Sequence, residues 1–408
     1  MKTQRVVILG STGSIGRATL DVIAALAGQF EVAGLAAGSN AKRLAEQARR
    51  LRPAAVSLVD GPAAESLRAE LPADCTLYCG LDSAAELVRN VQADIVVNAI
   101  VGVAGLYATL AGVRTAKRVA IANKEPLVVA GPLILTEAAR HGTEILPIDS
   151  EHSALFQAMQ GGRRDEVVRA YLTASGGPFR QWSLERMEQA TVQEALAHPT
   201  WRMGQKITVD SATMMNKALE IVEACRLFGL APEQVLVLVH PESVIHSIVQ
   251  FGDGSFLAQM SSPDMRVPIS YALTYPRRMA GPAKVLDIYG LRQLNFEPPD
   301  VKRFPAIDLG YEVIRRGGTS GAVLNAANEV AVDAFLNGQI PFGRIVPTVR
   351  QVLSSHEAGS ADSIESLLQA DSWARRQTQA ALGLCRGSGP WSRNHDNDPA
   401  MNRVSPGT

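Results

Sequence analysis

"ILGSTGSIGRATLDVI", residues 8–23, decides the fold of the first part of the chain. Gly10, Gly13 and Gly16 stand between an apolar run and an amphipathic one, in a G-x-x-G-x-x-G spacing that departs from the commoner G-x-G-x-x-G. Residues without a Cβ let backbone amides approach a pyrophosphate at a helix N-terminus. Because a strand-like run precedes the glycines and a helix-like run follows them, the motif favours dinucleotide binding over a plain tight turn.

The pattern around this loop continues to about residue 149. Short β-rich runs alternate with helical ones, which is typical of a parallel sheet with crossover helices. We expect a helix over residues 40–51 with Asn40 as its N-cap. Strands are expected at residues 5–9, 31–36, 55–59, 94–100, 118–122 and 144–148. This order predicts an α/β fold whose N-terminal domain, residues 1–149, is a Rossmann-like, doubly wound parallel sheet.

The pattern of predicted strands and helices changes after residue 150. Several runs look like strands joined by loops, "FGDGS" at 251–255 predicts a hairpin turn, and residues 211–228 look helical. Long helical patterns follow a Pro-rich crossing, and the last residues are polar and rich in Gly, Pro and Asn. We expect a central α+β catalytic domain over 150–275, a linker over 276–304, a small helical domain over 305–383 and a disordered tail over 384–408.

Composition excludes several classes of partner. Lys+Arg and Asp+Glu number 40 each among 408 residues, so no net field recruits nucleic acid or an anionic membrane. The one membrane-like stretch, residues 95–113, contains Asn98 and three glycines, and is predicted to be a buried strand, a turn and a buried helix. The four cysteines lack zinc-site spacing, which favours free thiols in a reducing, cytoplasmic compartment.

The end of the second predicted strand bears on the choice of nicotinamide cofactor. An acidic residue there would bind the ribose 2'-hydroxyl and disfavour a 2'-phosphate. The sequence "AAGSNAKR" has no acid, and Ser39 and Asn40 are followed by Lys42 and Arg43. This favours NADPH, although the basic pair could instead be the solvated face of a helix.

Two carboxylates follow the last predicted strand. Asp149 and Glu151 stand at i and i+2, so in extended chain both point the same way, towards the crevice where such folds bind ligands. A third acid, Glu220, lies on a predicted helix that Ser211 could cap, with Asn216 four residues earlier on the same face. Three carboxylates without a cysteine or histidine cluster select Mg2+ or Mn2+ over Zn2+. Taken singly, each acid could be a solvated surface charge.

Hydroxyl and amide donors accompany these acids. Ser175 precedes a Gly-Gly turn, and "DSATMMNK" offers Ser211, Asn216 and Lys217. Hydroxyls, an amide and one point charge resemble a phosphate cradle.

A segment without helical or strand-like hydrophobic periodicity lies between these donors in the sequence. Residues 197–204, "AHPTWRMG", carry His198 and Trp201 between a proline and a glycine. This composition suits a mobile lid with an aromatic cover. Trp201 could equally be an ordinary core residue.

Six motifs together resemble one known family. "GSTGSIG", "ANKE", "DSEH", "TASGGPF", "HPTW" and "DSATMMNKALE", in this order and spacing, closely resemble the 1-deoxy-D-xylulose 5-phosphate reductoisomerases of the non-mevalonate isoprenoid pathway. The likeness runs from about residue 6 to about residue 382 and includes "LNAANE" at 324–329. Such long motifs in series are far more specific than any single one.

The resemblance implies a homodimer that uses NADPH and Mg2+ or Mn2+ to convert a linear ketose phosphate into 2-C-methyl-D-erythritol 4-phosphate. It gives the metal to Asp149, Glu151 and Glu220, which with Lys124 form the implied catalytic set. Implied substrate contacts are Lys124, Ser150, Glu151, Ser175, His198, Ser211, Asn216, Lys217 and Glu220. Implied cofactor contacts are Thr12, Gly13, Ser14, Ile15, Gly38, Ser39, Asn40, Asn123, Glu125 and Gly204.

Two departures and two alternatives accompany the resemblance. Pro126 follows "ANKE" where the family often has Ser or Thr, and the tail after residue 383 matches nothing in the family. His152 and His246 could each be structural, so neither is assigned to catalysis. One alternative is a plain NAD(P)-dependent dehydrogenase of a small aldehyde, which would need no divalent ion. The other is a nucleotide-sensing module, which would bind the cofactor without oxidising it.

Overall fold

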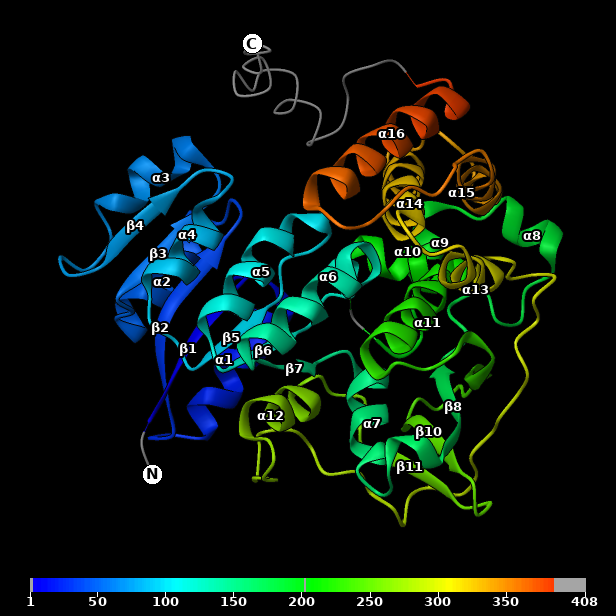
Figure 1. Ribbon diagram of the computed structural model, residues 1–408, viewed down its shortest axis with the longest axis horizontal. Helices are drawn as coiled ribbons and strands as arrows, with labels where there is room; N and C mark the ends of the chain where they lie inside the picture. The colour runs from blue at the N-terminus through cyan, green and yellow to red at the C-terminus, as the bar shows by residue number, and fades with distance from the viewer. Residues whose placement is uncertain (1–2, 202, 385–408) are drawn as a thin grey trace, which may run out of the picture.

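The computed structural model describes residues 3–201 and 203–384. Within them, a parallel sheet lies at one end of the molecule, a smaller mixed sheet at the other, and the C-terminal helices pack on helices that lie between the two sheets (Figure 1). The predicted fold class is therefore confirmed. The predicted disordered tail lies outside the described residues except for Leu384.

The first sheet has seven strands in the order β4-β3-β2-β1-β5-β6-β7, all parallel. Its strands are β1 Gln4–Leu9, β2 Phe30–Ala37, β3 Ala55–Leu58, β4 Thr76–Cys79, β5 Ile95–Asn98, β6 Arg118–Ile121 and β7 Glu144–Pro147. All six predicted strands are present. The prediction missed β4, because this edge strand is short and only partly buried, and so lacks the apolar run that marks the others.

Helices cover both faces of this sheet. They are α1 Ser14–Ala25, α2 Ala41–Leu51, α3 Gly61–Arg68, α4 Ser83–Asn90, α5 Leu106–Thr115 and α6 Glu125–His141. Alternate residues of β1 point to opposite faces: Val7 and Leu9 pack with α4, α5 and α6, whereas Val6 and Ile8 pack with α1, α2 and α3. The membrane-like stretch forms β5, a short turn and α5, as predicted. Among the described residues, no helix has both the length and the apolarity to cross a bilayer.

The glycine loop turns sharply between β1 and α1. Gly10 has φ of +78°, a left-handed conformation that favours glycine. A Cβ on Gly16 would lie 2.3 Å from the Gly10 carbonyl oxygen, so these two glycines allow the helix to approach the strand. The loop therefore has the geometry that the spacing predicts.

The second sheet has four strands in the order β11-β10-β8-β9. They are β8 Val167–Ala174, β9 Val235–Val239, β10 Ile245–Phe251 and β11 Phe256–Met260. The β8–β9 pair is parallel and the other two pairs are antiparallel. The predicted hairpin turn joins β10 to β11. Helices α7 Ser150–Met159 and α11 Met215–Phe228 pack against one face of this sheet.

One predicted helix is two helices. Helix α10 covers Gln205–Thr213, and α11 starts at Met215 after Met214 adopts φ of +60°. Ser211 therefore lies in the last turn of α10, and the prediction that it caps the next helix was wrong. Met214 is buried, so core packing holds a left-handed conformation that a methionine does not signal in sequence.

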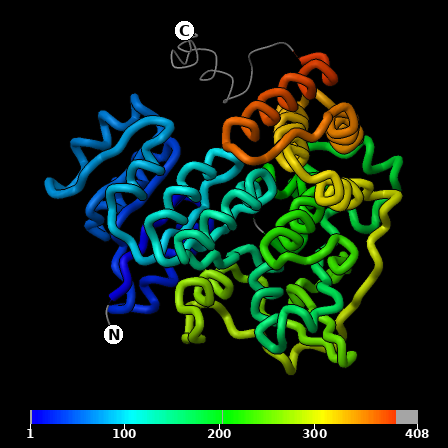
Figure 2. Tube along the Cα trace, in the orientation of Figure 1, coloured from blue at the N-terminus to red at the C-terminus, as the bar shows by residue number. Residues whose placement is uncertain are grey.

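The remaining helices are α8 Leu184–Glu188, α9 Val192–Ala195, α12 Arg266–Thr274, α13 Ala306–Arg316, α14 Ser320–Leu336, α15 Ile345–Ser354 and α16 Ile364–Leu382. Of these, α12, α13 and α14 between them pack on helices of both sheets. The chain returns to the first sheet at α12, which packs on α1. It then runs along the outer side of the second sheet to α13 (Figure 2).

An arginine links the helices α6 and α11. Helix α6 is kinked at Ala130, and Pro132 inside it lacks the N–H that would bond to the carbonyl of Val128. Arg226 of α11 donates to that carbonyl and to the carbonyl of Leu127, the latter at 2.7 Å. Burial lowers the pKa of Arg226 to about 10. This arginine therefore fixes α11 against the helix that follows β6.

Candidate active site

Asp149 and Glu151 lie where the chain leaves β7, at the carboxyl edge of the first sheet. Asp149 is the N-cap of α7, and Ser150 and Glu151 form the first turn of that helix. The expectation that these residues continue in extended chain was wrong, because the helix begins at Ser150. Asp149 makes no side-chain cap hydrogen bond, so its carboxylate is directed to other partners. An acid in a first turn is favoured by the helix dipole.

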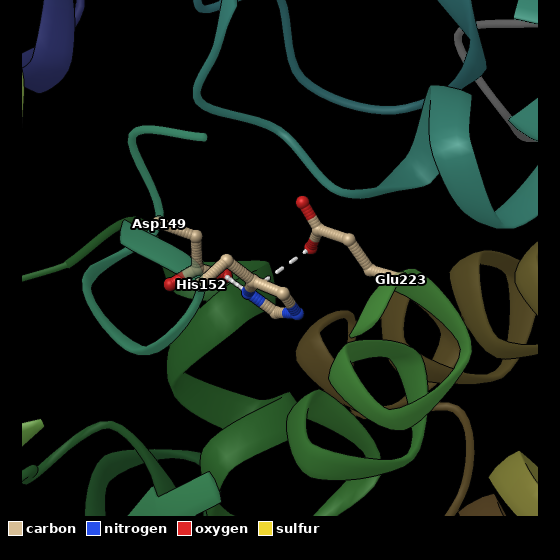
Figure 3. A group of neighbouring side chains, drawn as sticks. All are labelled: Asp149, His152 and Glu223. Carbon is tan, nitrogen blue, oxygen red and sulfur yellow. Dashed lines mark ion pairs between the residues drawn. The ribbon is translucent and has the colours of Figure 1, made fainter. Parts of the chain in front are cut away.

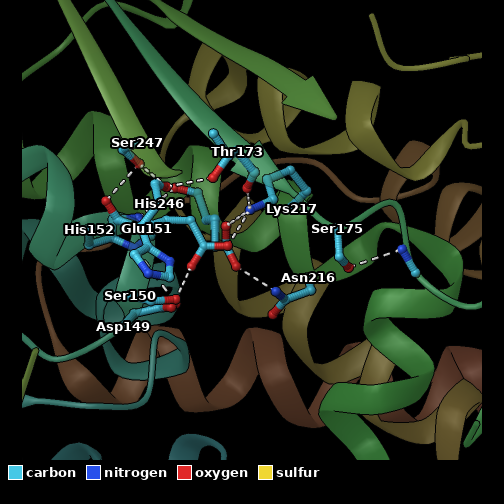
Figure 4. Close-up of polar contacts among 12 residues, drawn as sticks. Asp149, Ser150, Glu151, His152, Thr173, Ser175, Asn216, Lys217, His246 and Ser247 are labelled. Carbon is cyan, nitrogen blue, oxygen red and sulfur yellow. Dashed lines mark hydrogen bonds and ion pairs between the residues drawn. The ribbon is translucent and has the colours of Figure 1, made fainter. Parts of the chain in front are cut away.

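Helix α11 brings the third acid. Asn216, Lys217 and Glu220 lie on one face of this helix, and the Asn216 amide donates to Glu220, as their spacing predicts. Asn216 and Lys217 point towards Glu151 (Figure 4). Carboxylate oxygens of Asp149, Glu151 and Glu220 all lie within 4.8 Å of one another.

Two lysines stand among these acids. Lys124, the residue before α6, has its Nζ 2.5 Å from Asp149 Oδ2 and 2.9 Å from Glu220 Oε1. Lys217 Nζ lies 2.9 Å from Glu151 Oε1 and also contacts Glu220. Three carboxylates and two ammonium groups leave one net negative charge in a buried cluster. Ionised groups at such depth require close partners.

The cluster controls the ionisation of its own members. Burial works against the charge of Lys124, but Asp149 and Glu220 outweigh it and hold the pKa of the ammonium above its usual value. Burial likewise opposes ionisation of Asp149, yet Lys124 and His152 lower the pKa of its carboxyl. Burial and the nearby charge of Glu151 raise the pKa of Glu220.

The donor set fits a hard divalent cation. Because these oxygens lie no more than 4.8 Å apart, and an Mg2+–oxygen bond is about 2.1 Å long, small side-chain shifts would let one ion reach all three acids. All three donors are carboxylate oxygens, which suit Mg2+ and Mn2+. The net negative charge of the cluster favours a cation over a neutral ligand.

The hydroxyl of Ser175 lies on the Asn216 side of the acids (Figure 4). Ser175 follows β8, and its Oγ lies 3.0 Å from Nε2 of His198. Nδ1 of His198 accepts from the backbone N–H groups of Thr200 and Trp201, so the ring proton is on Nε2 and points at Ser175. Burial lowers the pKa of His198, which agrees with a neutral ring.

Ser150 and Ser211 contribute the remaining hydroxyls. The Ser150 hydroxyl donates to the Glu151 carboxylate. Ser211 lies next to the Gly-Gly turn, since a Cβ on Gly177 would be 2.6 Å from the Ser211 carbonyl oxygen. The turn that follows Ser175 therefore lies against the backbone of Ser211 in α10.

The predicted cofactor residues follow three strands of the first sheet, except for Gly204, which precedes α10. Thr12, Gly13, Ser14 and Ile15 form the turn into α1, whose first N–H groups lack intrahelical partners. Residues 38–40 are exposed after β2. Asn123 and Glu125 lie after β6, and Gly204 is the N-cap of α10.

Side chains near the glycine loop bear on the cofactor. Asn40 caps α2 by accepting from the Arg43 N–H at 3.1 Å, as predicted. The Arg43 guanidinium reaches back to the Thr12 carbonyl at 3.3 Å, so this cation lies beside the glycine loop. Glu125 pairs with Lys206 of α10 at 3.2 Å, which joins the start of α6 to the helix after residues 197–204. Pro126 sits in the first turn of α6, where proline is tolerated.

A doubly wound sheet, with a glycine loop and a three-carboxylate cluster on one edge, defines a nucleotide-dependent oxidoreductase. Protein-family models match residues 6–131 (1-deoxy-D-xylulose 5-phosphate reductoisomerase), 145–228 (the C-terminal domain of the same enzyme) and 260–377 (DXP reductoisomerase C-terminal domain). The chain belongs to the 1-deoxy-D-xylulose 5-phosphate reductoisomerase family, and the resemblance found in the sequence is confirmed.

Relatives with this name match almost the whole chain. The Pelotomaculum thermopropionicum protein is 49% identical over 377 residues, which cover 91% of this chain and 97% of that protein. The Chlorobium chlorochromatii protein is 48% identical over 376 residues, covering 92% and 98%.

Solved structures agree. The Zymomonas mobilis enzyme in complex with NADPH has a TM-score of 0.88 at 44% identity, with 93% of this chain and 99% of that chain covered. A DOX-P reductoisomerase in complex with NADPH, fosmidomycin and magnesium has a TM-score of 0.87 at 38% identity, covering 93% and 98%. A plain dehydrogenase is not favoured.

Proposed function

We propose that this chain converts 1-deoxy-D-xylulose 5-phosphate into 2-C-methyl-D-erythritol 4-phosphate, with NADPH as reductant and Mg2+ or Mn2+ as cofactor. The observation that carries this proposal is the convergence of Asp149, Glu151 and Glu220 within 4.8 Å, beside two lysines, at the edge of the sheet that bears the glycine loop. A rearrangement followed by a reduction needs a cation and a hydride source at one place, and family membership agrees with that chemistry.

The acids would hold the cation, and the glycine loop would hold the cofactor. A divalent ion bound there supplies positive charge that stabilises oxyanion charge developing at a substrate carbonyl or hydroxyl. Bound NADPH supplies the hydride for reduction of the rearranged aldehyde. The cofactor would lie along Thr12, Gly13, Ser14, Ile15, Gly38, Ser39, Asn40, Asn123, Glu125 and Gly204.

The lysines and hydroxyls would position the substrate. Lys124 is charged at neutral pH, and can donate to a substrate oxygen when the cation takes over its carboxylate partners. Ser150 is adjacent to both acids in the chain and would contact the sugar backbone. The phosphate would be bound by Ser175, His198, Ser211, Asn216 and Lys217. His198 supports this role because its Nε2 proton is directed towards Ser175, so the serine hydroxyl is free to donate outward.

Residues 197–204 would close over the substrate. Their position supports this, since the His198 ring reaches Ser175 and the Trp201 ring lies 6.3 Å from that of His246. A closed loop excludes water, which protects a reactive carbonyl fragment from side reactions.

The enzyme would act as a homodimer through the outer face of the second sheet. Ile248 stands opposite Tyr171, which stands opposite Leu236, so three partly exposed apolar side chains form a row. Phe256 extends the patch and is 55% exposed. In a twofold dimer the same patch of both subunits forms the interface, so a second copy of the chain would cover this apolar surface. Light scattering should give twice the chain mass, and Ile248→Lys should give the monomer mass.

A spectrophotometric assay tests the activity. Loss of NADPH absorbance should require both 1-deoxy-D-xylulose 5-phosphate and added Mg2+ or Mn2+, and EDTA should abolish it. Turnover that persists in EDTA would favour the plain dehydrogenase. Cofactor binding without NADPH loss would favour the nucleotide-sensing module.

A further inference from the structure

We propose that Glu223 is a positioning residue that acts through His152 on the Asp149 carboxylate. The inference rests on the proposed function, because it concerns the acids that would hold the cation. Glu223 belongs to α11 and His152 to α7, so the contact also joins the two helices that carry those acids (Figure 3).

The His152 ring is held from both sides. Its Nε2 lies 3.0 Å from the backbone carbonyl oxygen of Glu220. A carbonyl only accepts, so Nε2 carries a hydrogen. Nδ1 faces two carboxylates, at 3.4 Å from Glu223 Oε2 and 3.6 Å from Asp149 Oδ2. The Phe228 ring lies nearly parallel to the imidazole, at an interplanar angle of 12°. Rotation of the ring would break its contacts with α11.

Glu223 has no evident structural reason to be acidic. Its side chain is 1% exposed, and neither carboxylate oxygen accepts a hydrogen bond from any described residue. Its one ion-pair contact in the described part of the chain is His152. A well-packed apolar residue usually stabilises a buried site at least as well as such an ion pair. The acid therefore fits a role in orienting the imidazole better than a role in stability.

The orientation passes to Asp149. This residue makes no side-chain cap bond to α7, and one of its carboxylate oxygens, Oδ2, contacts both Lys124 Nζ at 2.5 Å and His152 Nδ1 at 3.6 Å. A bound cation would replace Lys124 as the partner of Asp149, and the His152 imidazole would then be the side chain that still orients this carboxylate. Partners of ligating carboxylates typically contribute 10–100-fold to metal affinity.

Binding of Mn2+ to the metal-free protein, followed by electron paramagnetic resonance, tests this role without turnover. Glu223→Gln should raise the Kd for Mn2+ by about 10–100-fold, and His152→Gln should raise it similarly. The double variant should bind no more weakly than the weaker single variant, because both residues act through one contact chain. Glu233→Gln, an exposed acid just beyond α11, is the matched control and should bind like the parent.

Melting of the metal-free variants checks their folding. Should Glu223→Gln fail to melt cooperatively, Glu223→Asp is measured instead, and its retracted carboxylate should also weaken Mn2+ binding. Two results overturn the inference: a Kd within threefold of the parent for the folded variant, or additive effects in the double variant, which would indicate a through-space charge effect. Absence of Mn2+ binding to the parent protein would instead contradict the proposed function.

Discussion

Replacement of Glu220 by glutamine should separate cation binding from stability. Glu220 is fully buried and is the acid that contacts both Lys124 and Lys217. The change removes one ligand and one negative charge. Two carboxylates and two ammonium groups then remain, and the net charge of the cluster changes from one negative charge to zero. A divalent ion would then meet a neutral cluster. We expect its affinity to fall at least 100-fold, about 2.7 kcal/mol, because a lost ligand costs more than a lost outer partner.

Stability should move the other way. Burial and Glu151 raise the pKa of Glu220, so its ionised form is disfavoured in the folded, metal-free protein. Both lysines keep another partner, since Lys124 retains Asp149 and Lys217 retains Glu151. Calorimetry of the metal-free variant should show an equal or higher melting temperature, while Mn2+ titration and NADPH oxidation show the loss. Near-normal turnover at saturating Mg2+, or a strongly lowered melting temperature with intact Mn2+ binding, would refute this reasoning.

Three further predictions concern other parts of the chain. Ser39→Asp should shift the NADPH-to-NADH ratio of kcat/KM towards NADH on the order of tenfold, because the new charge would face the 2'-phosphate; an unchanged ratio would remove Ser39 from the cofactor site. Arg226→Met should lower the free energy of unfolding by about 2–3 kcal/mol in urea denaturation, since two α6 carbonyls lose their donor; a change under about 0.5 kcal/mol would contradict this. In the metal-free protein, the share of the stability that comes from Glu223 and His152 should fall from pH 5 to pH 9, because the folded state keeps protons on Glu223 (pKa about 7) and His152 (pKa about 9) that the unfolded chain releases. His152→Gln should flatten the upper part of that urea-midpoint profile, and an unchanged slope would contradict the assignment.

The strands and the glycine loop could be predicted because their signals are local. Buried parallel strands such as β1 and β5 are continuous apolar runs, and Gly10 and Gly16 have spacings that a close strand-to-helix turn requires. Strand β4 lacked that signal because its side chains remain partly exposed at the sheet edge.

Features set by tertiary packing could not be predicted. Met214 adopts a left-handed backbone conformation between α10 and α11, and its buried side chain is held there by core packing. The residues around it carry no sequence signal for the end of a helix. The start of α7 at Ser150 could not be predicted either. The sequence predicts extended chain for Asp149 and Glu151, whereas Asp149 is the N-cap of α7 and Glu151 lies in its first turn.

The acidic site was predicted in outline. Motif order supplied Asp149, Glu151 and Glu220, but the contact between His152 and Glu223 depends on how α7 packs against α11. The spacing of Glu220 and Glu223, three residues apart on one helix, is the signal that could have drawn attention to the second acid. Domain boundaries, the lid and the cytoplasmic location stay predictions.

Anomalous diffraction from a crystal soaked in Mn2+ tests the central claim most directly. We predict one peak about 2.2 Å from a carboxylate oxygen of each of Asp149, Glu151 and Glu220. A crystal with no peak between these acids, or with its only peak on the His152 and Glu223 side, would contradict the account.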